Sequence, residues 1–191
     1  MSKVYGVGTY VSDECGVMFK DTNVYKIWSR MLERCYSKAN KSYRYSYRHC
    51  TVSSFFLDFS NFRSWCIEQT GFGNDDWQLD KDILVRGNKV YSEDTCCFVP
   101  REVNLFFTKA DKIRGKYPIG VHWIKRSKKF GACIYIGKNI NLGTFDNEWS
   151  AFLAYKKAKE NRAKELANKW YGQIDDRVYD KLMNYKVLIT D

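Results

Sequence analysis

Residues 118–158 read PIGVHWIKRSKKFGACIYIGKNINLGTFDNEWSAFLAYKKA, and this stretch decides the fold of the second half of the chain. Three short runs, residues 119–125, 129–136 and 139–145, have the length and patterning of β-strands. The segment that begins at Gly137 makes a tight turn between the last two runs. We therefore expect three consecutive strands in this part of the chain.

A long helix is predicted to follow these strands. Asn147 is its N-cap, because an asparagine side chain accepts hydrogen bonds from the first free backbone N–H groups of a helix. The helix should stop at Gly172, and a last short helix is expected over about residues 175–186.

The same stretch resembles the AP2 DNA-binding domain, which is known from plant transcription factors and from phage homing endonucleases. The shared elements, in matching order and spacing, are Gly120-Val121, Lys129-Phe130-x-Ala132, Ile134, Gly137-Lys138, Leu142-Gly143-x-Phe145, and Ala151 through Ala154-Tyr155. The resemblance implies a three-stranded antiparallel sheet packed on one helix, with its open face in the major groove of double-stranded DNA.

Period-two alternation along the strands places a set of side chains on that open face. The lysines are expected at phosphates, and His122, Arg126 and Asn141 at base edges. The arginine-rich reading set of the plant family is not reproduced here, and its tryptophan positions hold Phe130 and Asn141, so the preferred DNA sequence does not carry over. The candidate DNA-binding residues are His122, Lys125, Arg126, Lys128, Lys129, Tyr135, Lys138, Asn139 and Asn141, with Ile124 also pointing outward.

The overall charge fits a polyanionic partner. The chain has 32 Lys and Arg against 22 Asp and Glu, a formal net charge of +10, and such a surface attracts nucleic acid from solution. A membrane partner is not expected, because the sequence contains neither a basic amphipathic helix with a clean apolar face nor an apolar run of about 20 residues. No apolar signal segment opens the chain, which predicts a cytoplasmic protein, in the host cell if a phage encodes it.

The first half is predicted as a separate α+β domain. An amphipathic helix is expected over residues 24–37, and a helix that is mostly core over 53–69, with Ser53 as its N-cap. Residues 77–84 and 96–99 are expected to be strands, with a turn at Gly87-Asn88. Pro100 suits the first turn of a helix that runs to about residue 110.

These elements divide the chain into residues 1–110, a basic linker over 111–118, and residues 119–191. Residues 38–50 are basic and rich in tyrosine, and they read equally well as a loop along a phosphate backbone or as a solvated loop.

The strand–loop–strand–helix order can bring one carboxylate and one amide oxygen to a single hard cation. Asp80 lies on the first strand and Asn104 in the first turns of the helix. Oxygen ligands of this kind suit Mg²⁺, and such an ion stabilises charge on a phosphodiester that is being cleaved.

Residues 25–110 resemble the HNH homing endonucleases of bacteriophages. The shared patterns are the helix segment Trp28–Tyr36, the aromatic run at 59–65, LDKDI at 79–83, GN at 87–88 and CCFVPREVN at 96–104. The resemblance implies a ββα-metal fold and a DNA endonuclease that uses Mg²⁺ or Mn²⁺, with Asp80 and Asn104 at the metal-binding positions and no small-molecule cofactor.

The chain departs from this family at two positions. The histidine that activates water in the family is replaced by Lys81, and the family's middle asparagine, which helps to hold the histidine loop, falls near Thr95. Lysine has an ordinary pKa of about 10.4 and acts as a base only after strong desolvation. His49 is an alternative base, and the competing interpretation of Asp80 is an ordinary strand acid.

The cysteines have two interpretations. Seven is an odd number, which argues against a framework of disulfides alone. Cys35, His49, Cys50 and Cys66 could converge on zinc, but their spacing matches no standard finger. Buried, reduced cysteines are therefore expected.

Three functional hypotheses follow. The first is a phage-type homing endonuclease that nicks or cuts DNA with Asp80, Lys81 and Asn104 as catalytic residues. The second is a catalytically inactive, sequence-specific DNA-binding protein of the same ancestry, acting as a repressor or interference factor. The third is a counter-defence protein that binds a host protein or RNA. The sequence leaves the oligomeric state open.

Overall fold

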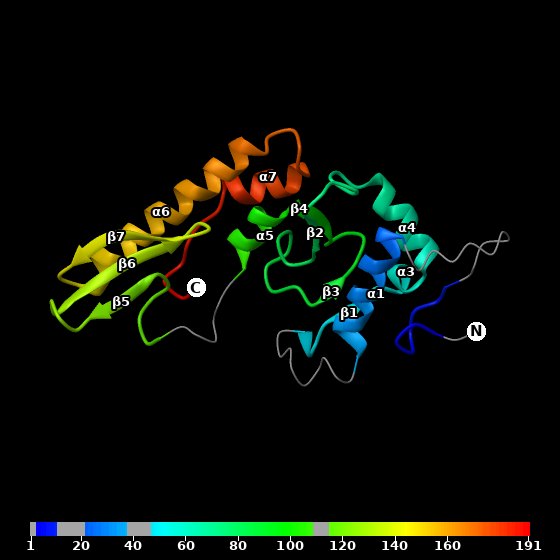
Figure 1. The fold of residues 1–191 in the computed structure, drawn as a ribbon, viewed down its shortest axis with the longest axis horizontal. Coiled ribbons are helices and arrows are strands. Elements are labelled where there is room, and N and C mark those ends of the chain that lie inside the picture. The colour runs from blue at the N-terminus through cyan, green and yellow to red at the C-terminus, as the bar shows by residue number, and fades with distance from the viewer. Residues whose placement is uncertain (1–2, 11–21, 38–46, 109–114) are drawn as a thin grey trace. The chain divides into compact units, whose positions relative to one another are not determined.

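A computed structural model describes residues 3–10, 22–37, 47–108 and 115–191 of the chain. The fold is mixed α+β and consists of two compact units (Figure 1). The first unit comprises Met1–Asn104 and Gln173–Val178, and the second comprises Leu105–Gly172 and Tyr179–Asp191. The division falls at Asn104, whereas the sequence placed the boundary at residues 111–118, of which 111–114 lie outside the described residues.

The first unit is built around aromatic residues on its helices. Helix α1 spans Asn23–Tyr36, α3 spans Ser54–Leu57 and α4 spans Phe59–Glu68. The ring of Trp28 is fully buried, and its indole N–H donates to the Phe56 carbonyl at 2.7 Å. That bond satisfies the only polar atom of the buried indole, so the ring can serve as the centre of this core.

The helix predicted over residues 53–69 is interrupted. Ser53 caps α3 as expected, by accepting from Phe56 N–H at 3.2 Å. Asp58, however, is extended, and its carboxylate caps α4 by accepting from Ser60 N–H at 2.8 Å. An aspartate inside an apolar helical pattern can start a second helix because its side chain competes for backbone N–H groups.

The strands of the first unit are short. Strand β1 (Thr51–Val52) pairs in parallel with β3 (Val90–Tyr91), and β2 (Trp77–Asp80) pairs antiparallel with β4 (Cys97–Pro100). Helix α5 (Arg101–Phe107) follows β4 directly.

Two details of this segment differ from expectation. The strand expected to reach residue 84 ends at Asp80, because the Asp80 side chain turns the chain by accepting two backbone N–H groups. Pro100 closes β4 and does not lie within the helix.

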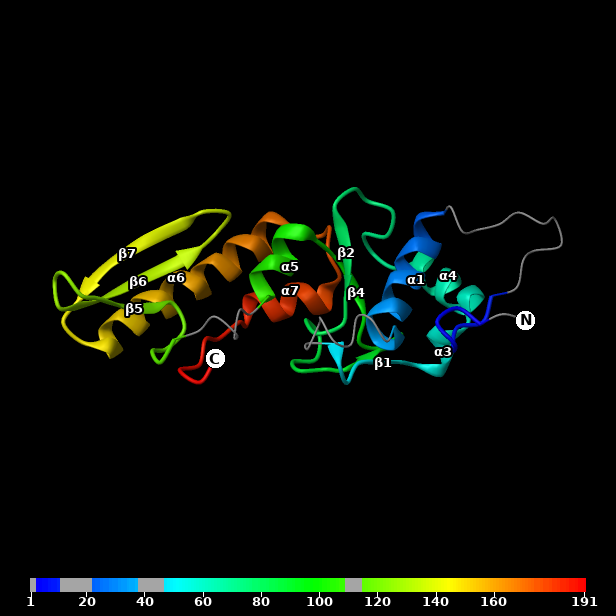
Figure 2. The ribbon, with the colours of Figure 1, turned by 60° about the horizontal axis from the view of Figure 1, so that its bottom comes forward.

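The second unit is a three-stranded antiparallel sheet with a long helix along one face. Strands β5 (Val121–Ile124), β6 (Lys129–Tyr135) and β7 (Asn139–Phe145) lie in sequence order. Helix α6 (Glu148–Lys169) runs along them, as Figures 1 and 2 show. Helix α7 (Asp176–Met183) is shorter than the predicted range of 175–186.

The core of this unit lies between the sheet and α6. Ala132 and Ile134 on the middle strand are buried, and so are Phe152 and Tyr155 on the helix. Gly120 has a φ of +77°, and a Cβ built there would lie 2.0 Å from the Tyr155 ring, so only glycine allows this contact. Asn147 caps α6 as predicted, accepting from Ser150 N–H at 2.8 Å.

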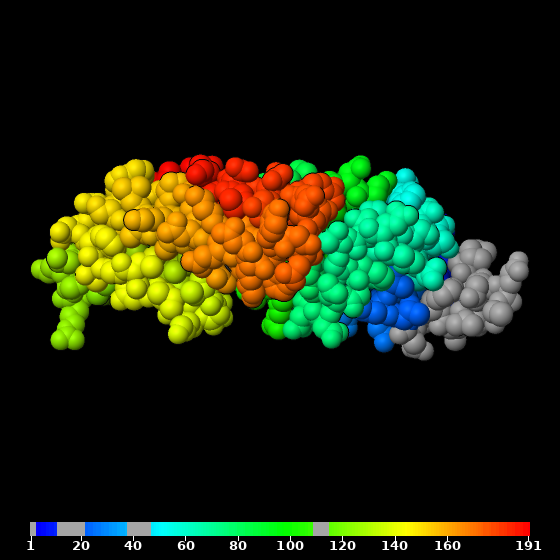
Figure 3. All heavy atoms as spheres, turned by 90° about the horizontal axis from the view of Figure 1, so that it is seen from above, coloured from blue at the N-terminus to red at the C-terminus, as the bar shows by residue number. Residues whose placement is uncertain are grey.

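The outer side of α6 is exposed, with the apolar Trp149 and Leu153 near its start and polar residues further along. Lys157, Asn161 and Lys164 are exposed residues of this helix. The surface of α6 and of the segment that follows it is coloured yellow to orange in the space-filling view (Figure 3).

Candidate functional site

One face of the three-stranded sheet is directed away from α6. Cross-strand partners share a face of an antiparallel sheet, so the register fixes which side chains lie opposite the buried Ala132 and Ile134. His122 pairs with Gly131, Asn141 with Cys133, and Asn139 with Tyr135. The side chains on this outer face are those of His122, Ile124, Lys129, Cys133, Tyr135, Asn139, Asn141 and Thr144, all exposed except the half-buried Ile124 and Cys133.

The absence of a side chain at Gly131 leaves space on the outer face for the His122 ring. A Cβ added at Gly131 would lie 2.5 Å from His122 Nε2 and 3.0 Å from the tip of Ile124. Both side chains therefore lie across the middle strand at the one position where that strand has no side chain. Gly131 thus positions the imidazole ring, a role that the sequence analysis missed.

Asn141 is held by the backbone two residues ahead of it. Its Oδ1 accepts a hydrogen bond from Gly143 N–H at 2.9 Å. The regular register of β6 and β7 is interrupted between Ala132 and Cys133, where the pairing skips Leu142. This β-bulge and its side-chain bond give Asn141 one defined orientation on an exposed strand.

The remaining cationic candidates lie in the turns that border the sheet. Lys125, Arg126 and Lys128 are exposed in the turn between β5 and β6, where Lys128 has a φ of +50°. Lys138 is exposed in the turn between β6 and β7. Lys129 begins β6 and pairs with the exposed carboxylate of Asp146 at 3.0 Å.

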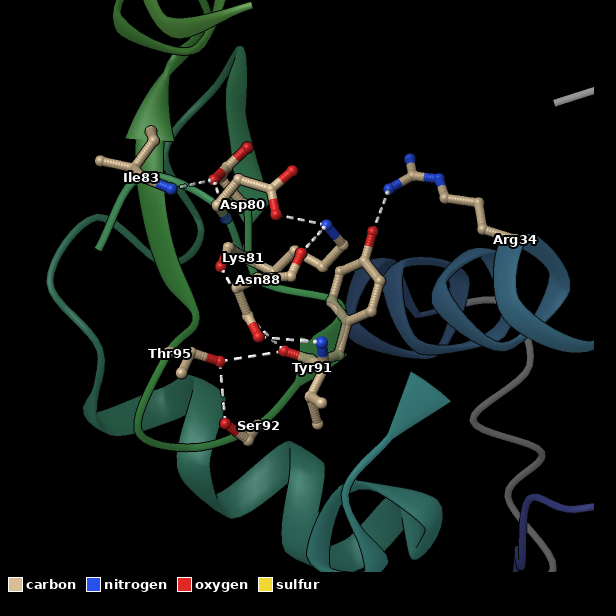
Figure 4. A network of polar contacts seen from close by, with 10 residues as sticks. Arg34, Asp80, Lys81, Ile83, Asn88, Tyr91, Ser92 and Thr95 are labelled. Atoms are coloured by element: carbon tan, nitrogen blue, oxygen red, sulfur yellow. Dashed lines mark hydrogen bonds and ion pairs between the residues drawn. The ribbon is translucent and has the colours of Figure 1, made fainter. Parts of the chain in front are cut away.

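In the first unit, Asp80 ends β2 with one carboxylate oxygen bound by the following loop. Its Oδ1 accepts from Asp82 N–H at 2.6 Å and from Ile83 N–H at 2.9 Å (Figure 4). Burial raises the pKa of the Asp80 carboxyl above its ordinary value, although the two backbone bonds oppose this effect. The raised pKa reflects a carboxylate with poor access to water, which gains from a nearby cation.

Lys81 is directed inward. Its side chain is only 4% exposed. Its ammonium group forms an ion pair with Asp82, donates to the Asn88 carbonyl at 2.9 Å and lies 5.6 Å from the centre of the Tyr91 ring. These contacts all suit a charged ammonium group, whereas a general base would need the neutral amine.

Asn88 holds the loop that carries Lys81, and this corrects the sequence analysis, which placed that role near Thr95. The Asn88 side chain donates to the carbonyls of Lys81 at 2.8 Å and Val90 at 2.6 Å, and accepts from Val90 N–H at 3.0 Å. Thr95 supports the same loop less directly, by donating to the Val90 carbonyl at 3.0 Å (Figure 4). The sequence signal was present as Gly87-Asn88 but was assigned only to a turn.

Asn104 lies on the same side of the β2–β4 pair as Asp80. Its amide group donates to Gln78 Oε1 at 2.6 Å, and Gln78 and Asp80 are two residues apart on β2, so they share a face. One carboxylate and one amide therefore lie on a common face of the β2–β4 pair.

The zinc alternative gains no support from the geometry. His49 is exposed, whereas Cys35, Cys50 and Cys66 are reduced cysteines in buried positions. Burial raises the pKa of the Cys66 thiol, which keeps it protonated and inert. Across the described ranges, no three His, Cys, Asp or Glu side chains are grouped as ligands for a metal ion.

Some of the sequence predictions concern residues that the structure does not describe. The basic, tyrosine-rich segment falls mainly on residues 38–46, and half of the predicted linker falls within 109–114; both ranges lie outside the described residues. Among the helices that are described, none has the length and apolar character needed to cross a bilayer.

Comparison with models of known protein families, with curated proteins and with solved structures gave no match.

Proposed function

We propose that this protein binds double-stranded DNA through the outer face of the β5–β6–β7 sheet. The observation that carries the proposal is the charge of this sheet. Residues 121–145 contain five Lys and Arg and no Asp or Glu, and all five cationic side chains are exposed at the face or in the turns beside it. Such a surface neutralises phosphates along a duplex.

The shape of the sheet supports the same partner. The major groove is wide enough to admit β-strands, whose alternate side chains then reach base edges. The outer face presents hydrogen-bonding groups at several such positions, among them His122, Asn139 and Asn141. A three-stranded antiparallel sheet packed on one helix is also what the resemblance to the AP2 domain implies, which supports an AP2-like fold for this unit.

Fluorescence anisotropy with a labelled duplex tests this proposal. We expect affinity to fall linearly with salt on a double-logarithmic plot, with a slope of about −0.9 for each phosphate contacted. Arg126→Ala and Lys129→Ala should weaken binding, and each lost phosphate contact should reduce the slope by about 1. Lys157→Ala and Lys164→Ala make the same charge change on α6 and serve as matched controls.

Two results would overturn this proposal. The first is equal weakening by the sheet variants and the α6 variants, which would show that only net charge matters. The second is binding to duplex DNA that does not depend on salt. Tighter binding to RNA or to a host protein than to any duplex would favour the counter-defence hypothesis instead.

A second candidate function, metal-dependent nicking of DNA, is favoured by the β2–β4–α5 segment. The support is that Asn104 bonds to Gln78, which shares a face of β2 with Asp80, and that the resemblance to HNH endonucleases implies metal-binding roles for Asp80 and Asn104. Two protein oxygens suit Mg²⁺ or Mn²⁺, because Mg²⁺ commonly keeps waters and substrate phosphates as its other ligands. The ion would supply charge stabilisation at the phosphate, while the inward, ion-paired Lys81 argues against a lysine base.

Nicking of supercoiled plasmid carrying a selected binding site, with Mg²⁺ or Mn²⁺, decides between cutting and binding alone. Asp80→Asn is the sharper variant, because an amide oxygen can still accept the two backbone N–H groups while the negative charge is removed. Nicking that Asp80→Asn abolishes at unchanged DNA affinity would establish an endonuclease. Full-affinity binding without nicking by the unaltered protein would leave a sequence-specific binding protein of endonuclease ancestry.

A further inference from the structure

We infer that Asn141 selects guanine, and not adenine, at one position of the bound DNA, because the β-bulge fixes its amide with the nitrogen directed outward. This inference rests on the proposed binding of duplex DNA by the outer face. Asparagine most often pairs with adenine in the major groove, where its oxygen accepts from N6 and its nitrogen donates to N7. That pairing needs both ends of the amide to be directed at the base.

At the β-bulge, the oxygen of the Asn141 amide is engaged in a hydrogen bond to the backbone. Cys133 pairs with Asn141 and Ala132 pairs with Gly143, so Leu142 is the extra residue of β7. Gly143 has a φ of +120°, a conformation that is open to glycine and strained for other residues. This conformation goes with the bond from Gly143 N–H to Asn141 Oδ1 at 2.9 Å, so the oxygen is directed along the strand.

Because the oxygen of the Asn141 amide accepts from Gly143 N–H, the NH₂ group of the amide is left to act as a donor in the major groove. Asn141 is exposed on the face that carries the other candidate base contacts, so its NH₂ group is the end offered to a base. Guanine presents two neighbouring acceptors there, N7 and O6, whereas adenine places an N6 donor beside its N7. The NH₂ group therefore meets two acceptors on guanine but an opposing donor on adenine.

The geometry also predicts how the preference can be reversed. In Asn141→Asp, a carboxylate oxygen still accepts from Gly143 N–H, but the outward oxygen is now an acceptor. A carboxylate accepts from the N4 amino group of cytosine. The size of the side chain and its anchoring bond stay the same, and only the hydrogen-bonding character of the outer atom changes.

The experiment is in vitro selection of binding sites by the full chain from a pool of randomised duplexes. The unaltered protein, Asn141→Ala, Asn141→Asp and the control Asn161→Asp, which makes the same charge change on α6, are compared. We expect one guanine position to lose about tenfold of its preference in Asn141→Ala and to become cytosine in Asn141→Asp. Asn161→Asp should leave every position as it is in the unaltered protein.

The inference fails if the position that Asn141→Ala relaxes is adenine or thymine, or if Asn141→Asp leaves the guanine preference intact. It also fails if neither variant alters any position. These outcomes leave duplex binding itself standing. If no sequence is enriched and the protein has no salt-dependent affinity for a duplex, the proposed function fails as well, so the two failures are distinguishable.

Discussion

Lys81 stands where the HNH endonucleases have a histidine. Replacement of Lys81 tests whether this residue stabilises the loop around it or takes part in DNA cleavage. In Lys81→Ala, three methylene groups of a side chain that is only 4% exposed are lost, at about 0.8 kcal/mol each. The half-buried Asn88 carbonyl loses its donor, which costs about 1 kcal/mol. The ion pair with Asp82 adds little, because the Asp82 side chain is 53% exposed.

The expected loss is therefore about 3 kcal/mol of the free energy of unfolding of the first unit. Lys81→Met keeps the apolar stem and removes only the ammonium group, so its expected loss is about 1 kcal/mol. Lys89→Ala is the matched control, since Lys89 is an exposed lysine in the same loop, and its effect should stay within about 0.5 kcal/mol.

Urea unfolding followed by tryptophan fluorescence measures these differences, because Trp28 and Trp65 are buried in the first unit. The ordering expected is Lys81→Ala below Lys81→Met, and both below Lys89→Ala. Wild-type stability in both Lys81 variants, together with loss of plasmid nicking, would refute the structural role and would instead make Lys81 a catalytic residue.

Three other changes test separate contacts. Gly131→Ala should displace His122 and lower DNA affinity about tenfold, and in a His122→Ala background it should have almost no further effect; additive losses would show that Gly131 acts on something else. Asn88→Ala should cost about 2 kcal/mol in urea unfolding, since it removes three hydrogen bonds, and an unchanged midpoint would contradict its role. Burial raises the pKa of Glu160, but its bonds from Lys156 and from the Val187 N–H outweigh burial and leave that pKa below its ordinary value. The second unit should therefore lose stability as pH falls below about 4.3, and Glu160→Gln should be less sensitive to pH there; identical profiles would exclude Glu160 as the cause.

Periodicity located the strands of the second unit and most of the outward side chains, but Arg126 and Lys128, which alternation placed on the sheet face, lie in the turn between β5 and β6. The predicted strand over 139–145 matches β7, and the residues expected to point outward, such as His122 and Asn139, lie opposite the buried Ala132 and Ile134. Alternation succeeds here because a sheet with one face on a helix core buries every second side chain.

The first unit was harder to predict because side-chain bonds to the backbone override the apolar pattern. Asp58 divides one expected helix into two, and Asp80 ends a strand four residues early. The inward direction of Lys81 was equally hidden, since a lysine beside two aspartates is normally a solvated residue. The Asn88 carbonyl, the Tyr91 ring and the Cys50 thiol, which come from other parts of the first unit, give its ammonium group a buried position.

The same local motif sets the chemistry of both candidate sites. Asp80, Asn88 and Asn141 each accept, through a side-chain oxygen, the backbone N–H two residues further along the chain. Asp and Asn favour this arrangement because their short side chains reach that N–H and mimic a backbone turn. The motif decides which atom of a polar side chain remains to face a partner. It follows that the alternation of side chains along β7 locates Asn141 on the outer face. The hydrogen bond from Gly143 N–H determines that Asn141 faces DNA as a donor. The base selected by Asn141→Asp therefore tests the effect of that hydrogen bond.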